Sequence, residues 1–121
     1  MTKLLAGRRV LVVEDEMLVL MMIEDMLADL GCDSVAAAAT VDQALALIGG
    51  QHFDAALLDV NLNGKDSHSV ADALVARDVP FAFSTGYSEY HPSESGLDRP
   101  VLRKPFKYEE LGEILARVLA R

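Results

Sequence analysis

The stretch "ALLDVNLNG", residues 56–64, brings a carboxylate to the end of an apolar run. The run leads directly into Asp59, after which the chain turns polar and reaches Gly64. A continuous apolar run bounded by turn residues favours a strand buried on both faces of a sheet. On its own, an aspartate at such a strand end favours an Asx turn or a cap. The alternative, that Asp59 performs chemistry at the rim of the sheet, depends on what the other strands end on.

Strand patterns alternate with helix patterns along the whole chain. The expected strands are residues 8–13, 34–39, 53–58, 80–85 and 100–103. The expected helices are an apolar stripe over 20–30 that ends at Gly31, a capped helix over 40–48, a short helix over 69–77 and a final stripe over 111–119. This alternation predicts an α/β fold with a doubly wound, five-stranded parallel sheet of order 2-1-3-4-5. Residues 86–99 lack an apolar period, so we expect the fourth helix to be short or absent.

Composition and charge narrow the classes of function. The 121 residues, half of them hydrophobic, fit one domain over 1–121 with its core within 8–120. A net charge of −8 argues against a nucleic-acid partner, because binding phosphates requires a basic surface. The most apolar run, residues 17–23, is too short to span a membrane, and no secretory signal is visible. A single cysteine, Cys32, cannot form an internal disulfide, and we expect a cytoplasmic protein.

Polar residues follow four of the five expected strands. They are Glu14 and Asp15 after the first, Asp59 and Asn61 after the third, Thr85 after the fourth and Lys104 after the fifth. The carboxyl ends of parallel strands share one edge of the sheet, so these residues should converge there.

Such a convergence predicts chemistry on phosphate. Two carboxylates 4 Å apart repel by about 4 kcal/mol at an effective dielectric of 20, and a hard cation such as Mg²⁺ is the natural compensation. A lysine and a threonine hydroxyl supply the charge and the donor that a phosphoryl group requires. The set therefore predicts a carboxylate that accepts a phosphoryl group.

Four motifs in this order carry a resemblance to a known family. They are "VLVVEDE" at 10–16, "LLDVNLNG" at 57–64, "FSTGY" at 83–87 and "RKPF" at 103–106. Each motif alone is weak, but the ordered set resembles the receiver domain of two-component response regulators. The resemblance implies that Asp59 is the phosphoacceptor and that Mg²⁺ is the cofactor. It also implies that Asp15 binds the metal directly, Glu14 through water, and Asn61 through its carbonyl.

The resemblance assigns further roles and shows one departure. Thr85 and Lys104 would contact the phosphoryl oxygens, with a cis bond between Lys104 and Pro105. The family usually carries an aromatic residue three positions before the lysine, but here that position is Val101. We therefore expect the signal to pass through ordering of residues 86–99, with Tyr87 as a candidate switch residue.

The segment "PFAFSTGY", residues 80–87, resembles the PFxFATGY subgroup of receivers, with a serine in place of the alanine. Members of that subgroup often work with histidine kinases of the HWE or a related type. They occur as single-domain proteins or as the tail of hybrid kinases.

Two residues of the first helix lie off its apolar stripe. Leu18 and Met22 are either partly buried under neighbouring loops or part of a docking face for a kinase helical bundle. The three histidines, His52, His68 and His91, show no ligand spacing and are expected at the surface.

Together these observations predict a phosphoacceptor receiver domain rather than an enzyme with a separate substrate. It would take a phosphoryl group from a histidine kinase or a phosphotransfer protein onto Asp59, hydrolyse it, and signal through contacts with a downstream protein. One alternative is a receiver domain excised from a hybrid histidine kinase. A second is an aspartyl-nucleophile phosphohydrolase, which requires a general acid where this chain has Asn61. A third is a pseudo-receiver that is never phosphorylated.

Overall fold

The computed structural model describes residues 3–62, 65–86 and 99–120, and its centre is one parallel sheet. The strands are β1 (Arg9–Val13), β2 (Ser34–Ala38), β3 (Ala55–Asp59), β6 (Phe81–Thr85) and β7 (Val101–Arg103). They lie in the order β2-β1-β3-β6-β7, and every neighbouring pair is parallel. Counted along the five long strands this is the order 2-1-3-4-5, so the predicted doubly wound fold is confirmed.

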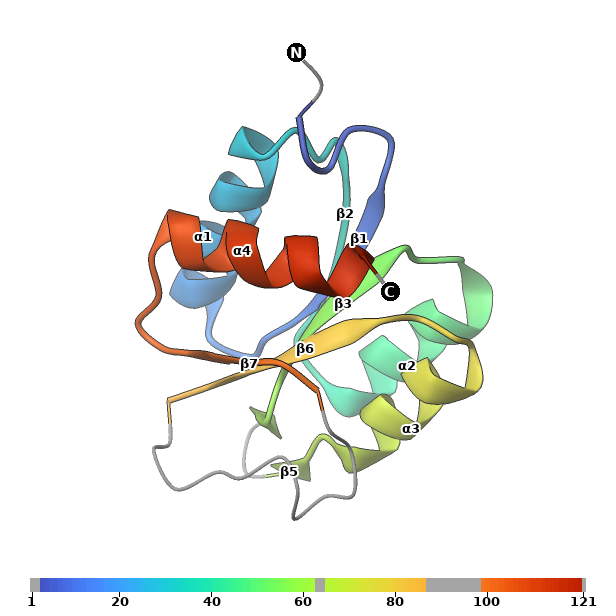
Figure 1. Cartoon of the computed structure of the whole chain (residues 1–121). Coiled ribbons are helices and arrows are strands. Elements are labelled where there is room, and N and C mark those ends of the chain that lie inside the picture. The colour runs from blue at the N-terminus through green and yellow to red at the C-terminus, as the bar shows by residue number, and fades with distance from the viewer. Residues whose placement is uncertain (1–2, 63–64, 87–98, 121) are drawn as a thin grey trace.

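Helices cover both faces of the sheet, as Figure 1 shows. The helices are α1 (Met17–Asp29), α2 (Val41–Gly50), α3 (His68–Ala76) and α4 (Tyr108–Leu119). One core lies between the sheet and the pair α1 and α4, and a second lies between the sheet and the pair α2 and α3. Because β3 and β6 are buried along their whole length, apolar residues fill positions 55–58 and 81–83 without alternation, and polar residues come only at the carboxyl ends.

The ends of the first two helices follow their sequence signals. Gly31 comes directly after the C-cap of α1 and has a φ of +93°, a left-handed conformation that favours glycine. Thr40 caps α2, and its hydroxyl accepts a hydrogen bond from Gln43 N at 3.1 Å. The helix α2 ends at Gly50, two residues beyond the expected end at Ile48.

Two features were not predicted from the sequence. The segment after Asp59, expected to be loop, contains the antiparallel pair β4 (Asn61–Leu62) and β5 (Lys65–Asp66). This pairing buries Leu62 to 1% exposure, which explains the apolar residue in a polar stretch. Before β1, Leu5 is fully buried in the core and its backbone N donates to Leu30 O at 3.0 Å.

The described residues end at Gly86 and resume at Arg99. Three predictions therefore depend on residues 87–98, which lie outside the described residues. They are the absence of a regular fourth helix, the ordering of residues 86–99, and the role of Tyr87 as a switch residue. Within the described part of the chain, no helix combines the length and apolarity needed to cross a membrane.

Candidate functional site

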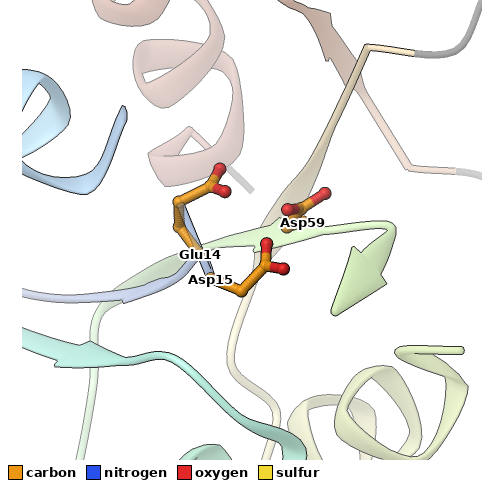
Figure 2. A group of neighbouring side chains, drawn as sticks. All are labelled: Glu14, Asp15 and Asp59. Atoms are coloured by element: carbon orange, nitrogen blue, oxygen red, sulfur yellow. The ribbon is translucent and has the colours of Figure 1, made fainter. Parts of the chain in front are cut away.

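Three carboxylates meet at the carboxyl edge of the sheet. Glu14 and Asp15 follow β1 directly, and Asp59 is the last residue of β3. The parallel pairing of Val13 with Leu58 aligns the carboxyl ends of β1 and β3. The three carboxylate side chains that follow or end these strands therefore lie close together. One oxygen from each lies within 4.8 Å of the other two, and Figure 2 shows the carboxylate of Asp15 turned towards that of Asp59.

The three acids differ in burial and support. Glu14 is 1% exposed and Asp59 is 4% exposed, whereas Asp15 is half-buried. The Glu14 backbone N donates to Ala38 O at 2.9 Å, and its side-chain Oε2 accepts from the backbone N of Glu16 at 3.1 Å. Glu14 is therefore held firmly at the start of the loop between β1 and α1.

Lys104 brings a positive charge to this cluster. Its Nζ lies 2.7 Å from Glu14 Oε1 and 3.3 Å from Asp59 Oδ2. The backbone N of Lys104 donates to Thr85 O at 2.8 Å, and the predicted cis bond between Lys104 and Pro105 is confirmed. Burial lowers the pKa of Lys104, but its contacts with Glu14 and Asp59 outweigh burial, so the pKa is raised overall. The side chain is therefore a permanent ammonium at neutral pH.

Thr85 lies at the carboxyl end of a central strand, as expected, whereas Asn61, expected in a loop, lies in the short strand β4. Thr85 is the last residue of β6 and is 1% exposed. Asn61 begins β4, two residues beyond Asp59, and the backbone between them is fixed because Val60 N donates to Ser84 O at 3.0 Å.

Ser67 is a supporting residue that the sequence did not reveal. It is 2% exposed, and its Oγ donates to Val60 O at 3.0 Å across the β4–β5 pair. This bond ties the far end of the loop back to the residue that follows Asp59. A serine before a helix reads as an ordinary cap, so only the loop closure seen in the structure identifies this contact.

The two docking candidates on α1 lie in different environments. Leu18 is 82% exposed, while Met22 is half-buried and packs against the core. Met17 and Met21, which the sequence did not single out, are 64% and 52% exposed beside Leu18. The exposed apolar face of α1 is therefore formed by Met17, Leu18 and Met21 rather than by Leu18 and Met22.

The donor set fits a hard divalent cation. Carboxylate oxygens are the ligands that Mg²⁺ prefers, and it needs only one or two of them because it keeps several waters. Asp15 and Asp59 each offer an oxygen to this cluster, and the Lys104 ammonium contacts Glu14 and Asp59. A cation with oxygen ligands would balance this charge.

Comparison with known proteins identifies the family. The model of the response regulator receiver domain matches residues 10–116. The chain belongs to the response regulator receiver family. A comparison with curated proteins gives no match.

Solved receiver structures share the fold over nearly the whole chain. SdrG from Sphingomonas melonis Fr1 is 45% identical, with a TM-score of 0.81 over 93% of this chain and 96% of its own. The BeF3-activated conformation of SdrG from Pseudomonas melonis Fr1 gives a TM-score of 0.79 at 45% identity, covering 94% of this chain and 98% of its own. The receiver domain of the sensor histidine kinase PA1611 from Pseudomonas aeruginosa PAO1, which has a magnesium ion coordinated in its active-site cleft, is 32% identical. Its TM-score is 0.83 over 96% of this chain and 100% of its own.

The receiver family interacts in general with histidine kinases or phosphotransfer proteins, and its acidic site binds Mg²⁺. In this receiver, Glu14, Asp15, Asp59 and Lys104 are together at one edge as predicted. The histidines His52 and His68 are exposed, as expected. Membership of the PFxFATGY subgroup stays a prediction.

Proposed function

We propose that Asp59 is the phosphoacceptor of a two-component phosphorelay. The phosphoryl group would come from a phosphohistidine of a histidine kinase or of a phosphotransfer protein, and the domain would work in the cytoplasm. The observation that carries the proposal is the position of Asp59, whose carboxylate lies within 4.8 Å of two other acids and 3.3 Å from the Lys104 ammonium. A structural cap would require neither neighbour.

The transfer follows from the side chains at the site. A carboxylate oxygen of Asp59 attacks the phosphorus, the N–P bond of phosphohistidine breaks, and its electron pair returns to the imidazole. Lys104 and the Thr85 hydroxyl contact the phosphoryl oxygens and hold them while charge shifts from donor to acceptor. Water later cleaves the acyl phosphate and releases inorganic phosphate, which restores Asp59. No separate substrate is turned over, so we do not expect an enzyme in the ordinary sense.

Asp15, Asp59 and the Asn61 carbonyl would hold the Mg²⁺ ion. When bound, the ion supplies positive charge for the phosphoryl oxygens. Support comes from the facing carboxylates of Asp15 and Asp59 and from the magnesium ion in the cleft of the PA1611 receiver domain.

Output would pass through protein contacts. A phosphoryl group brings up to two charges and three acceptor oxygens, which can create new charge-assisted hydrogen bonds in neighbouring backbone. We propose that residues 86–99 respond to it and that a kinase of the HWE type docks at the exposed face of α1. The BeF3-activated form of SdrG shows that a receiver 45% identical to this chain adopts an activated conformation.

Incubation with acetyl phosphate tests the proposal. With Mg²⁺ present, the intact mass of the wild type should rise by one phosphoryl group, while Asp59→Asn and a wild-type sample in EDTA should show no adduct. An equal adduct on Asp59→Asn, or none on the wild type, would refute the assignment.

One of the two remaining alternatives, the phosphohydrolase, is distinguished by a turnover assay. An aspartyl phosphohydrolase would release phosphate from simple phosphoesters over many turnovers, whereas a receiver should show no sustained release. A receiver domain from a hybrid kinase would show the same phosphorylation, so it differs in context rather than in chemistry.

A further inference from the structure

Ser84 lies beside the proposed phosphoacceptor in the sheet. Parallel pairing puts it next to Asp59 of β3 on one side and next to Leu102 of β7 on the other, with neighbouring strands about 4.8 Å apart. Register partners point to the same face of a sheet, and Leu102 packs into the core that α1 and α4 cover. The pair two residues earlier, Leu57 and Ala82, packs into the same core. Asp59 and Ser84 therefore project from this one face.

The Ser84 side chain is buried without a hydrogen bond. Ser84 is 1% exposed, and its hydroxyl pairs with no group in the described part of the chain. A polar atom in so buried a position normally has a partner. The hydroxyl is nevertheless not sealed from solvent, so it stays open to a group that arrives at the rim. The resting fold therefore leaves this donor unused.

The backbone holds this hydroxyl in a fixed place relative to Asp59. The carbonyl oxygen of Ser84 accepts from Val60 N at 3.0 Å, which ties Ser84 to the residue directly after the phosphoacceptor. Thr85, the next residue of β6, projects from the opposite face because side chains alternate along a strand. The two hydroxyls therefore approach the end of β3 from different sides.

Phosphorylation would bring acceptors to this donor. A phosphoryl group adds three acceptor oxygens and up to two negative charges to Asp59. Hydroxyl donors bond more strongly to charged oxygens than to neutral ones, and a serine hydroxyl rotates to suit its acceptor. Alanine, which the PFxFATGY motif has at this position, would fill the same space without a donor. A serine here therefore offers a hydrogen bond that only the phosphorylated form would use.

We propose that the Ser84 hydroxyl donates to an oxygen of the acyl phosphate on Asp59. It is a third donor beside Lys104 and Thr85, and it stabilises the phosphorylated form without stabilising the resting one. This inference rests on the proposed phosphoacceptor function of Asp59. It adds to that function a contact that a chain with alanine at this position cannot make.

Binding of BeF3⁻, a mimic of the phosphoryl group, measures this contact. At saturating Mg²⁺, Ser84→Ala should raise the BeF3⁻ concentration needed for half-saturation at least about threefold, because one hydrogen bond to the bound group is lost. Ser84→Cys keeps nearly the same volume but is a weak donor, so it should show the same loss. Isothermal titration calorimetry compares both variants with the wild type. A smaller rise in Ser84→Ala, or wild-type binding by Ser84→Cys, would overturn the proposal.

The stability of the resting protein separates this role from a structural one. In EDTA and without fluoride, Ser84→Ala should unfold at the same urea concentration as the wild type or at a higher one, because the lost hydroxyl had no partner. If it unfolds at a lower concentration, or does not fold, the hydroxyl supports the resting fold and the proposal is overturned.

Thr40→Ala is the matched control for a hydroxyl with a structural partner. The Thr40 hydroxyl accepts from Gln43 N at 3.1 Å at the start of α2, and the strand before it, β2, lies two places from β3 in the sheet. This variant should lose stability in EDTA and bind BeF3⁻ as the wild type does.

Two results keep this inference apart from the proposed function. If the wild type takes up no phosphoryl group from acetyl phosphate, the proposed function fails and this inference fails with it. If the wild type is phosphorylated and Ser84→Ala binds BeF3⁻ as tightly as the wild type, only this inference is refuted.

Discussion

At the residue scale, the site is a group of like charges that the fold holds together. Glu14, Asp15 and Asp59 lie within 4.8 Å of one another, and Lys104 contacts Glu14 and Asp59. Such a group costs stability in the absence of a metal ion, and the cost is what makes the site receptive to a cation and a phosphoryl group.

Asp15→Asn should therefore stabilise the metal-free protein. Removing one charge from the cluster should raise the free energy of unfolding in EDTA by about 1 kcal/mol. With Mg²⁺ at a hundred times its Kd, the free energy of unfolding of the wild type should rise by about 2.7 kcal/mol, and that of the variant by much less. Urea denaturation in EDTA and in Mg²⁺ measures both effects. A variant that is less stable in EDTA and gains as much from Mg²⁺ would contradict this description of the cluster.

Cys32 should react slowly while the protein is folded. It is 6% exposed, and burial, reinforced by the charge of Asp33, raises the pKa of its thiol. Because the thiolate is the reactive form, a raised pKa leaves less of it at pH 7.5. Modification by a thiol reagent should be at least about 100-fold slower in the native protein than in urea. A native rate within tenfold of the rate in urea would show that the thiol is accessible.

At the scale of the elements, the carboxyl ends of the strands position the chemistry. The positions of Glu14, Asp15, Asp59, Thr85 and Lys104 could be predicted because each lies at or within two residues of the end of an expected strand. The β4–β5 pair and the Ser67 contact could not, because two-residue strands have no period and a serine hydroxyl has many possible partners. The end of α2 was also missed, since two glycines usually end a helix but here continue it.

The exposed face of α1 has its own test. Leu18→Asp should abolish phosphoryl transfer from a phosphorylated histidine kinase and leave phosphorylation by acetyl phosphate unchanged. Leu18 is 82% exposed, so the substitution should change the free energy of unfolding by no more than about 0.5 kcal/mol. Asp25→Asn, an exposed change further along the same helix, is the control. Unchanged kinase-driven transfer in Leu18→Asp would remove this face as a docking site.

At the scale of the whole molecule, the core extends beyond the segment that matches the family. The match covers residues 10–116, yet Leu5 is fully buried against the core shared by α1 and α4. The sequence did not reveal this, because the apolar stretch that contains Leu4 and Leu5 is too short to carry a pattern. The order of the sheet, by contrast, follows from the alternation of strands and helices over the whole chain.

Leu5→Ala tests this extension of the core. Truncating a fully buried leucine should lower the free energy of unfolding by about 2–4 kcal/mol, while Leu4→Ala, at 39% exposure, should cost much less. Urea denaturation of the two variants side by side checks the difference. Equal and small losses would show that residues before β1 do not belong to the folded core.

The most direct test of Asp59 as the phosphoacceptor locates the phosphoryl group in the chain. After incubation with acetyl phosphate and Mg²⁺, sodium borohydride reduces an aspartyl phosphate to homoserine, and peptide mass mapping identifies the converted residue. We expect homoserine at residue 59 alone, and only when Mg²⁺ was present. Conversion at residue 15 or elsewhere, or no conversion at all, would contradict the proposed role of Asp59.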